Sequence, residues 1–167
     1  LMTTLYADLA MGEAVQDVLY LTPEGAPHIF LPPEDALIGE GRLRDKHGHG
    51  FDVVSPSILL ERAVVEDGLI RFPGGSAYRV LVLPLVESMT PELLTGITRL
   101  IRSGVTVIGA PPTRTPSLSG YPDCDKTVAA LAKELWGGNP SDAGIKDLRI
   151  GRGRLLCGGD LTKPASK

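Results

Sequence analysis

Two histidines separated by one residue bring metal-binding side chains close together in this sequence. His47 and His49 would point their rings to the same side of an extended segment, as a site with two imidazole ligands requires. Structural zinc needs four ligands and catalytic zinc needs three, and no third ligand is evident here. We therefore expect this pair, like the isolated His28, to be solvated loop histidines, and we expect no metal site and no cofactor.

A nucleophilic catalytic site needs a serine or cysteine at a sharp turn after a strand, with a base within reach. The corresponding turn in this chain is Gly109-Ala110-Pro111, where Ala110 offers no nucleophile. Neither a GxSxG motif nor a GxxxxGK phosphate loop occurs in the sequence. The two cysteines, Cys124 and Cys157, form no CxxC pair and are too few to indicate a disulfide framework.

Paired carboxylates are the remaining chemical possibility, because glycoside hydrolysis uses two of them. Glu87, Glu92, Asp123 and Asp125 fall on loops or helix starts. Carboxylates at helix N-termini are stabilised by the helix dipole and by water, which is the simpler reason for their presence. We therefore predict no catalytic residue in this chain.

Composition limits the possible classes of protein. The 167 residues, 43% of them hydrophobic, are enough for one soluble domain with a substantial core. The formal net charge of −3, the scattered bases and the three Phe residues argue against a nucleic-acid surface. No apolar run approaches the length of a membrane span, and no signal peptide is recognisable, so the compartment stays open. The chain begins with Leu1, from which we expect a piece of something longer.

The stretch that organises the predicted fold is YRVLVLPLVESMT, residues 78–90. Its unbroken apolar run, residues 80–83, is typical of a strand covered on both faces, and we predict a central strand with parallel neighbours. An amphipathic helix should follow, with Thr90 as its cap, Pro91 as its first residue and Gly104 as its end.

The other elements are predicted from the same kinds of signal. Ser55, whose side-chain oxygen is expected to cap the free amides, and Pro56 start a helix that runs to about residue 63. Asp67-Gly68 indicates a hairpin over residues 64–72. Helices are also expected at residues 3–11 and from near 122 to 136, and strands at 18–21, 51–54, 105–108 and 154–157. Nearby arginines indicate that the last strand is a sheet edge. Residues 22–50 are predicted to form a long polar connection without regular structure.

This order of strands and helices predicts an α/β fold: a flavodoxin-like, doubly wound, mostly parallel sheet with helices on both faces. Ligands of such folds bind beyond the carboxyl ends of the strands. The loop over residues 111–121 lies there and is rich in donors. We predict Arg114, Ser117, Ser119 and Tyr121 as residues that face a substrate or an interface.

Several consecutive blocks carry a family resemblance: FDVVSPSILLERAVVEDGLIRFPGGSAYRVLVLP, MTPELL, SGVTVIGAPPTRTPSLSGYPDCD and LAKELWG. From about Asp17 to Gly158 the chain resembles glycoside hydrolase family 106, the large α-L-rhamnosidase-like enzymes. The resemblance implies the glutamine-amidotransferase-like (class I) α/β domain of those multidomain enzymes, without their catalytic barrel. The nucleophilic cysteine of the wider amidotransferase-like group would lie near Ala110, so no amidotransferase activity is implied. The family's calcium ligands and catalytic acids belong to the barrel and match no position here.

These observations predict an accessory, noncatalytic domain of a hydrolase that cleaves terminal rhamnose from plant or microbial glycans. Residues 1–16 would be a remnant of a preceding helix or linker, residues 17–158 the domain, and residues 159–167 a tail. The expected partners are other domains of the same polypeptide and possibly carbohydrate. Two alternatives stay open: a carbohydrate-binding module that uses the 111–121 loop, and a purely structural scaffold. A large exposed apolar patch would favour the scaffold, and a small polar cleft would favour the sugar site.

Overall fold

The computed structural model describes residues 14–25, 37–39, 42–44, 50–117, 121–137 and 146–157. Its main sheet has eight strands: β1 (Ala14–Leu21), β4 (Phe51–Val54), β5 (Val64–Glu66), β6 (Leu69–Phe72), β7 (Ser76–Val82), β8 (Thr106–Ile108), β9 (Lys146–Ile150) and β10 (Gly153–Cys157). The helices are α2 (Pro56–Arg62), α3 (Pro91–Ser103) and α4 (Cys124–Trp136). A separate antiparallel pair is formed by β2 (Leu37–Gly39) and β3 (Arg42–Arg44).

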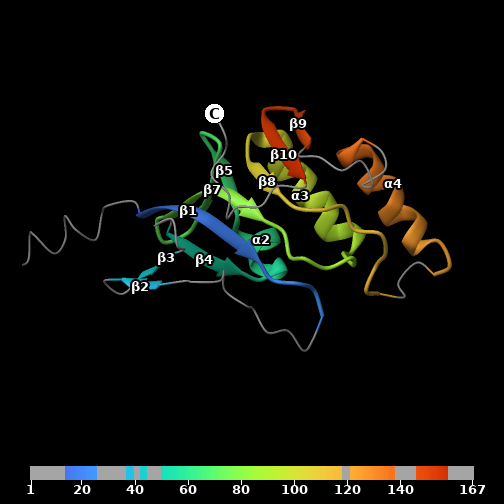
Figure 1. Ribbon diagram of the computed structural model, residues 1–167, viewed down its shortest axis with the longest axis horizontal. Helices are drawn as coiled ribbons and strands as arrows, with labels where there is room; N and C mark the ends of the chain where they lie inside the picture. Colours follow the sequence, from blue (N-terminus) through green and yellow to red (C-terminus); the bar gives the residue numbers. More distant parts are fainter. Residues whose placement is uncertain are drawn as a thin grey trace, which may run out of the picture.

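The sheet has the strand order β4-β1-β7-β8-β10-β9, with β5 and β6 attached through β7 (Figure 1). The five strands from β4 to β10 in this order pair in parallel. Strand β9 and the β5–β6 hairpin are antiparallel additions. The prediction of an α/β fold with a mostly parallel sheet is therefore confirmed.

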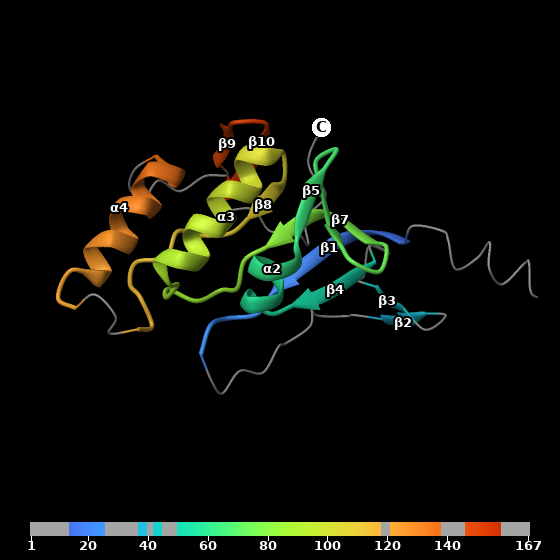
Figure 2. The same ribbon diagram turned by 180° about the vertical axis from the view of Figure 1, so that it is seen from behind.

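Strand β7 lies at the centre, as predicted, with parallel neighbours β1 and β8 on its two sides. Leu81 is fully buried and Leu83, just after the strand, is 3% exposed. Val80 and Val82 are only half-buried, so the expectation that the whole run is covered on both faces is wrong. The reason is that α2 and α3 lie together on one face of the sheet, as Figures 1 and 2 show from opposite sides.

The topology explains why these two helices share a face. The crossovers from β4 through α2 to β7 and from β7 through α3 to β8 advance in the same direction across the sheet. Right-handed crossovers that advance in the same direction place their helices on the same side. Helices on both faces, as in a doubly wound sheet, are thus not seen among the described residues.

Helix α3 follows its sequence signals closely. The Thr90 hydroxyl accepts a hydrogen bond from the Leu93 amide at 3.2 Å, Pro91 occupies the first turn, and Gly104 ends the helix at φ +126°. Its apolar face joins the sheet in one core. The buried residues of the helix are Leu93, Leu94, Gly96, Ile97, Leu100 and Ile101.

Helix α2 starts and ends where the sequence predicts, but by a different mechanism. The Ser55 side chain makes no cap hydrogen bond and contacts the Ser57 hydroxyl instead, so the predicted capping role of Ser55 is wrong. The helix is anchored by the buried Leu59. It approaches α3 closely at Gly96, where an added Cβ would lie 2.2 Å from a methyl carbon of Leu60.

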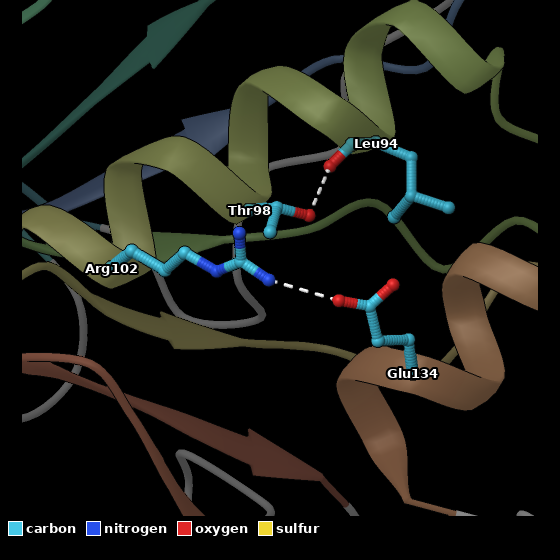
Figure 3. A network of polar contacts seen from close by, with 4 residues as sticks. All are labelled: Leu94, Thr98, Arg102 and Glu134. Carbon is cyan, nitrogen blue, oxygen red and sulfur yellow. Dashed lines mark hydrogen bonds and ion pairs between the residues drawn. The ribbon is translucent and has the colours of Figure 1, made fainter.

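Helix α4 packs beside α3, as Figure 3 shows from close by. Val128, Ala132 and Leu135 enter the same core. At the surface, Arg102 of α3 and Glu134 of α4 form an ion pair at 2.9 Å. Exposed pairs of this kind contribute little, so the buried side chains hold α4 in place. No helix within the described ranges is long and apolar enough to cross a membrane.

Three further sequence expectations differ from the structure, and a fourth lies outside it. Strand β10 lies between β8 and β9, so the predicted edge is wrong; Arg154 pairs across to Asp147 of the unpredicted edge strand β9. The β2–β3 hairpin lies inside the connection over residues 22–50 that was predicted to lack regular structure. The first strand begins at Ala14, earlier than predicted. The helix predicted over residues 3–11 lies outside the described residues.

Candidate interface at the carboxyl ends of the strands

Three loops meet beyond the carboxyl ends of the parallel strands. They follow β1, β7 and β8, and we call their described residues 22–25, 83–90, 109–117 and 121–125, the last of which begin α4, the carboxyl rim. Because neighbouring parallel strands end at the same edge of a sheet, loops distant in sequence come together there. The rim is where the sequence analysis placed the functional residues.

Glu24 joins the first loop to the start of α3. One carboxylate oxygen accepts from the Thr90 amide and the other from the Thr90 hydroxyl, both at 2.6 Å. The Thr90 hydroxyl in turn accepts from the Leu93 amide. A capping box normally supplies this carboxylate from the third residue of the helix, but that position is Leu93 here. Glu24 therefore caps α3 from 66 residues earlier in the chain.

Backbone hydrogen bonds join the second and third loops. Ser88 and Arg114 form a parallel bridge, in which the Met89 amide donates to the Arg114 carbonyl at 3.0 Å. The Thr113 amide donates to the Glu87 carbonyl at 2.8 Å. These contacts extend the pairing between β7 and β8 into the loops and give the rim a defined shape.

The third loop is also fixed to α4. The Asp125 carboxylate accepts from the Thr115 amide at 2.8 Å, and the Thr115 hydroxyl accepts from the Ser117 amide at 3.2 Å. At the other end of α4, the Trp136 indole donates to the Gly109 carbonyl at 3.0 Å. Both ends of α4 thus hold the loop that follows β8.

The predicted site residues are only partly brought together. The Arg114 guanidinium lies 3.8 Å from the Glu87 carboxylate and remains 65% exposed. Ser117 lies three residues further along the same loop, and Tyr121 is 75% exposed beyond it. Ser119 lies outside the described residues, as do the three histidines. The positions of Arg114, Ser117 and Tyr121 make them accessible but do not define a role for them.

The rim carboxylates have structural contacts. Glu87 pairs with Arg114, Asp123 pairs with Lys126 at 2.8 Å, and Asp125 holds the Thr115 amide. Asp125 also lies in the first turn of its helix, where the dipole stabilises a negative charge. No cluster of three or more metal-binding side chains occurs in the part of the chain that the structure describes.

Exposed apolar side chains are the most unusual feature of the rim. Leu85 is 99% exposed and its neighbour Val86 is 38% exposed. Together with Tyr121 they follow the ends of β7 and β8. Single exposed apolar residues need no explanation, but Leu85 and Val86 are adjacent in the chain, and contiguous exposed apolar surface is typical of a site that binds another protein segment.

Tyr78 and Asp147, elsewhere in the structure, have perturbed acidity. Burial, followed by the hydrogen bond to Asp52, raises the pKa of Tyr78 to about 12. The Arg154 guanidinium, through its hydrogen bond, lowers the pKa of the Asp147 carboxyl. Both have structural partners and lie outside the carboxyl rim.

The described residues thus form an α/β fold in which hydrogen bonds between loops give the carboxyl rim a defined shape. A family model described as alpha-L-rhamnosidase, glycoside hydrolase family 106, matches residues 5–166. The chain belongs to this family, as the sequence blocks indicated.

Two relatives show how much of a protein this chain represents. It is 36% identical over 130 residues to a protein of Formosa agariphila named "Putative beta-glucuronidase", covering 77% of this chain and 10% of that protein. It is 26% identical to the solved structure of a rhamnosidase from Novosphingobium sp. PP1Y, with a TM-score of 0.66. That match covers 88% of this chain and 13% of the rhamnosidase chain. Both relatives are therefore much longer proteins with further domains.

The main residue that sequence reasoning missed is Glu24. Two signals were available: the third residue of α3 lacks the carboxylate of a capping box, and Glu24 follows the end of a buried strand. Neither signal identifies Glu24 as the partner until the strand order places β1 beside β7.

Proposed function

We propose that this chain is an accessory, noncatalytic domain of a longer glycoside hydrolase that removes terminal rhamnose from glycans. We also assign it to the flavodoxin-like, glutamine-amidotransferase-like class of α/β domains, with residues 17–158 as the domain. The parallel sheet and the family membership support this assignment. Ala110 stands in the turn after β8, where that class would carry its nucleophile, so the domain does not transfer amide nitrogen.

The observation that carries the accessory role is the exposed apolar edge of the carboxyl rim. Leu85 stands fully in solvent, and Val86 and Tyr121 are also exposed. The rim carboxylates Glu87, Asp123 and Asp125 contact an arginine, a lysine and a backbone amide, which gives each of them a structural reason for its place. We therefore infer that the rim packs against another domain of the same polypeptide, which carries the catalytic groups.

The names of the two relatives point to different sugars, rhamnose and glucuronic acid. We favour rhamnose because the family model is described as alpha-L-rhamnosidase and the solved structure is that of a rhamnosidase. The carbohydrate-binding alternative rests on Tyr121, whose exposed ring could stack on a sugar, with Arg114 and Ser117 in the preceding loop. Its weakness is that Arg114 already lies beside Glu87.

Rim substitutions in the full-length enzyme test the proposal. Leu85→Ser, and Arg114→Ala combined with Tyr121→Ala, should lower rhamnosidase activity while changing the unfolding free energy of this chain by less than about 0.5 kcal/mol. Val64→Ser is the matched control, because Val64 is 53% exposed but lies on β5, away from the rim. Activity equal to the parent in both rim variants would exclude the rim as an interface.

A sugar titration distinguishes the two roles. Rhamnose added to the purified chain should leave the Tyr and Trp fluorescence unchanged if the rim is an interdomain surface. A saturable change that Tyr121→Ala abolishes would favour the carbohydrate-binding module instead.

A further inference from the structure

A cavity of about 230 Å³ opens beside α2, separate from the carboxyl rim. The cavity is lined by residues of four strands and one helix. Among them are Leu19 of β1, Val54 of β4, Ile58 of α2, Phe72 of β6 and Tyr78 of β7. None of its lining residues belongs to the rim loops. The cavity therefore needs an explanation of its own.

Two of its walls are held rigidly. The Tyr78 hydroxyl donates to the Asp52 carboxylate at 2.7 Å, and the Gln16 side-chain amide donates to the same carboxylate oxygen at 3.2 Å. The rings of Phe72 and Tyr78 pack edge to face with centroids 5.9 Å apart. A cavity with such fixed walls is preformed, which lowers the entropic cost of filling it.

Two of the apolar lining residues, Val53 of β4 and Ile58 of α2, are open to solvent. Val53 is 39% exposed and Ile58 is 45% exposed. Arg62 lies one helical turn after Ile58, on the same side of α2, and also lines the cavity. Ser76 adds a hydroxyl. The occupant that suits this lining is an apolar group with an acceptor or a negative charge near it.

The choice of occupant follows from the size and the polarity of the cavity. A free sugar needs several convergent polar groups, but the Tyr78 hydroxyl is already bonded to Asp52 and the Ser76 side chain is bonded to Tyr78, which leaves Arg62. A small pocket with aromatic walls is instead typical of sites that receive one anchoring side chain at a protein interface. Since this chain spans 13% of the solved relative, most of such a polypeptide lies outside it.

We propose that this cavity receives a large apolar side chain, with a carboxylate beside it that pairs with Arg62, from a domain of the same polypeptide outside residues 1–167. This inference rests on the proposed accessory function and adds a second contact with the rest of the enzyme. The apolar side chain covers Val53 and Ile58, and the carboxylate neutralises the guanidinium.

Site-specific photocrosslinking in the full-length enzyme tests the contact directly. Ile58→p-benzoylphenylalanine places the reactive group at the cavity, and the same replacement of Val64 is the control at a comparably exposed apolar site. After irradiation and digestion, mass spectrometry should identify a crosslinked peptide from outside residues 1–167 with Ile58 and none with Val64. A crosslink only within residues 1–167, a crosslinked dimer, or no crosslink at all would overturn the proposal.

A charge variant provides a second, independent measurement. Arg62→Glu should raise the rate at which limited proteolysis releases this domain from the full-length enzyme by about tenfold, and Arg62→Lys should largely preserve the parent rate. Equal release rates for all three proteins would contradict the predicted carboxylate. Failure of this contact can be distinguished from failure of the proposed function. Hydrolysis by the isolated chain would refute the accessory role whatever the crosslinks show, whereas a missing crosslink would refute only the contact at the cavity.

Discussion

Replacement of Glu24 tests whether α3 is capped by a residue from a distant loop. The Glu24 carboxylate accepts two hydrogen bonds of 2.6 Å from Thr90, at a partly buried position. Hydrogen bonds to charged groups contribute roughly 1.5 to 3 kcal/mol each. The two bonds share one side chain and are not additive, so Glu24→Ala should lower the unfolding free energy by about 2 to 3 kcal/mol.

Two further variants separate the effect of the Glu24 hydrogen bonds from the effect of a negative charge near the start of the helix. Glu24→Gln keeps one acceptor oxygen but places an amide NH₂ against a donor, so the loss should be about 1 kcal/mol. Glu92→Gln removes an exposed charge from the first turn of the same helix. It loses only the interaction with the dipole, roughly 0.3 to 1 kcal/mol.

Urea unfolding of the purified chain, followed by circular dichroism, provides the measurement. A double-mutant cycle of Glu24→Ala with Thr90→Ala should show a coupling free energy of about 1 kcal/mol. If Glu24→Ala unfolds within about 0.5 kcal/mol of the parent and the coupling is zero, the cap from the distant loop does not contribute to stability.

Three other predictions concern the core and Tyr78. Leu83→Ala should cost about 2 to 5 kcal/mol in urea unfolding, because Leu83 is 3% exposed; a loss below about 1 kcal/mol would contradict its central place. Gly153→Ala should cost about 1 to 3 kcal/mol, since the new Cβ would lie 2.1 Å from the Ile101 carbonyl oxygen, and unchanged stability would refute that contact. In the folded chain, absorbance at 295 nm should show one tyrosine titrating with a pKa near 12, and Tyr78→Phe should remove that step. Because the folded pKa exceeds the unfolded value near 10, the stabilisation is complete below pH 10 and is lost between pH 10 and 12.

The sequence predicts those parts of the fold that depend on local signals. Thr90, Pro91 and Gly104 mark the ends of α3 through local signals: a side-chain cap, a proline in the first turn and a glycine at positive φ. The apolar run around Leu81 identifies the central strand, although only the face that carries the fully buried Leu81 is completely covered. Both predictions use only neighbouring residues.

The parts that were missed depend on which strands become neighbours. Strand β9 has the alternating pattern of an edge strand, with Leu148 and Ile150 between charged residues, but only its pairing with β10 makes it one. The half-exposed Val80 and Val82 likewise depend on which face the helices occupy. For the candidate site, the sequence indicates the loop that contains Arg114. It does not indicate that Glu87 would hold that side chain, because the bridge between the two loops forms only in the folded sheet.

A rhamnoside hydrolysis assay on residues 1–167 tests the central claim most directly. Glycoside hydrolysis needs two carboxyl groups roughly 5 to 9.5 Å apart across a sugar-sized cleft. The rim carboxylates Glu87 and Asp123 are instead paired with Arg114 and Lys126. The purified chain, incubated with an aryl α-L-rhamnoside, should release no phenol above the rate without protein. Turnover that disappears in Glu87→Gln or Asp123→Asn would contradict the accessory role and establish an active site on the rim.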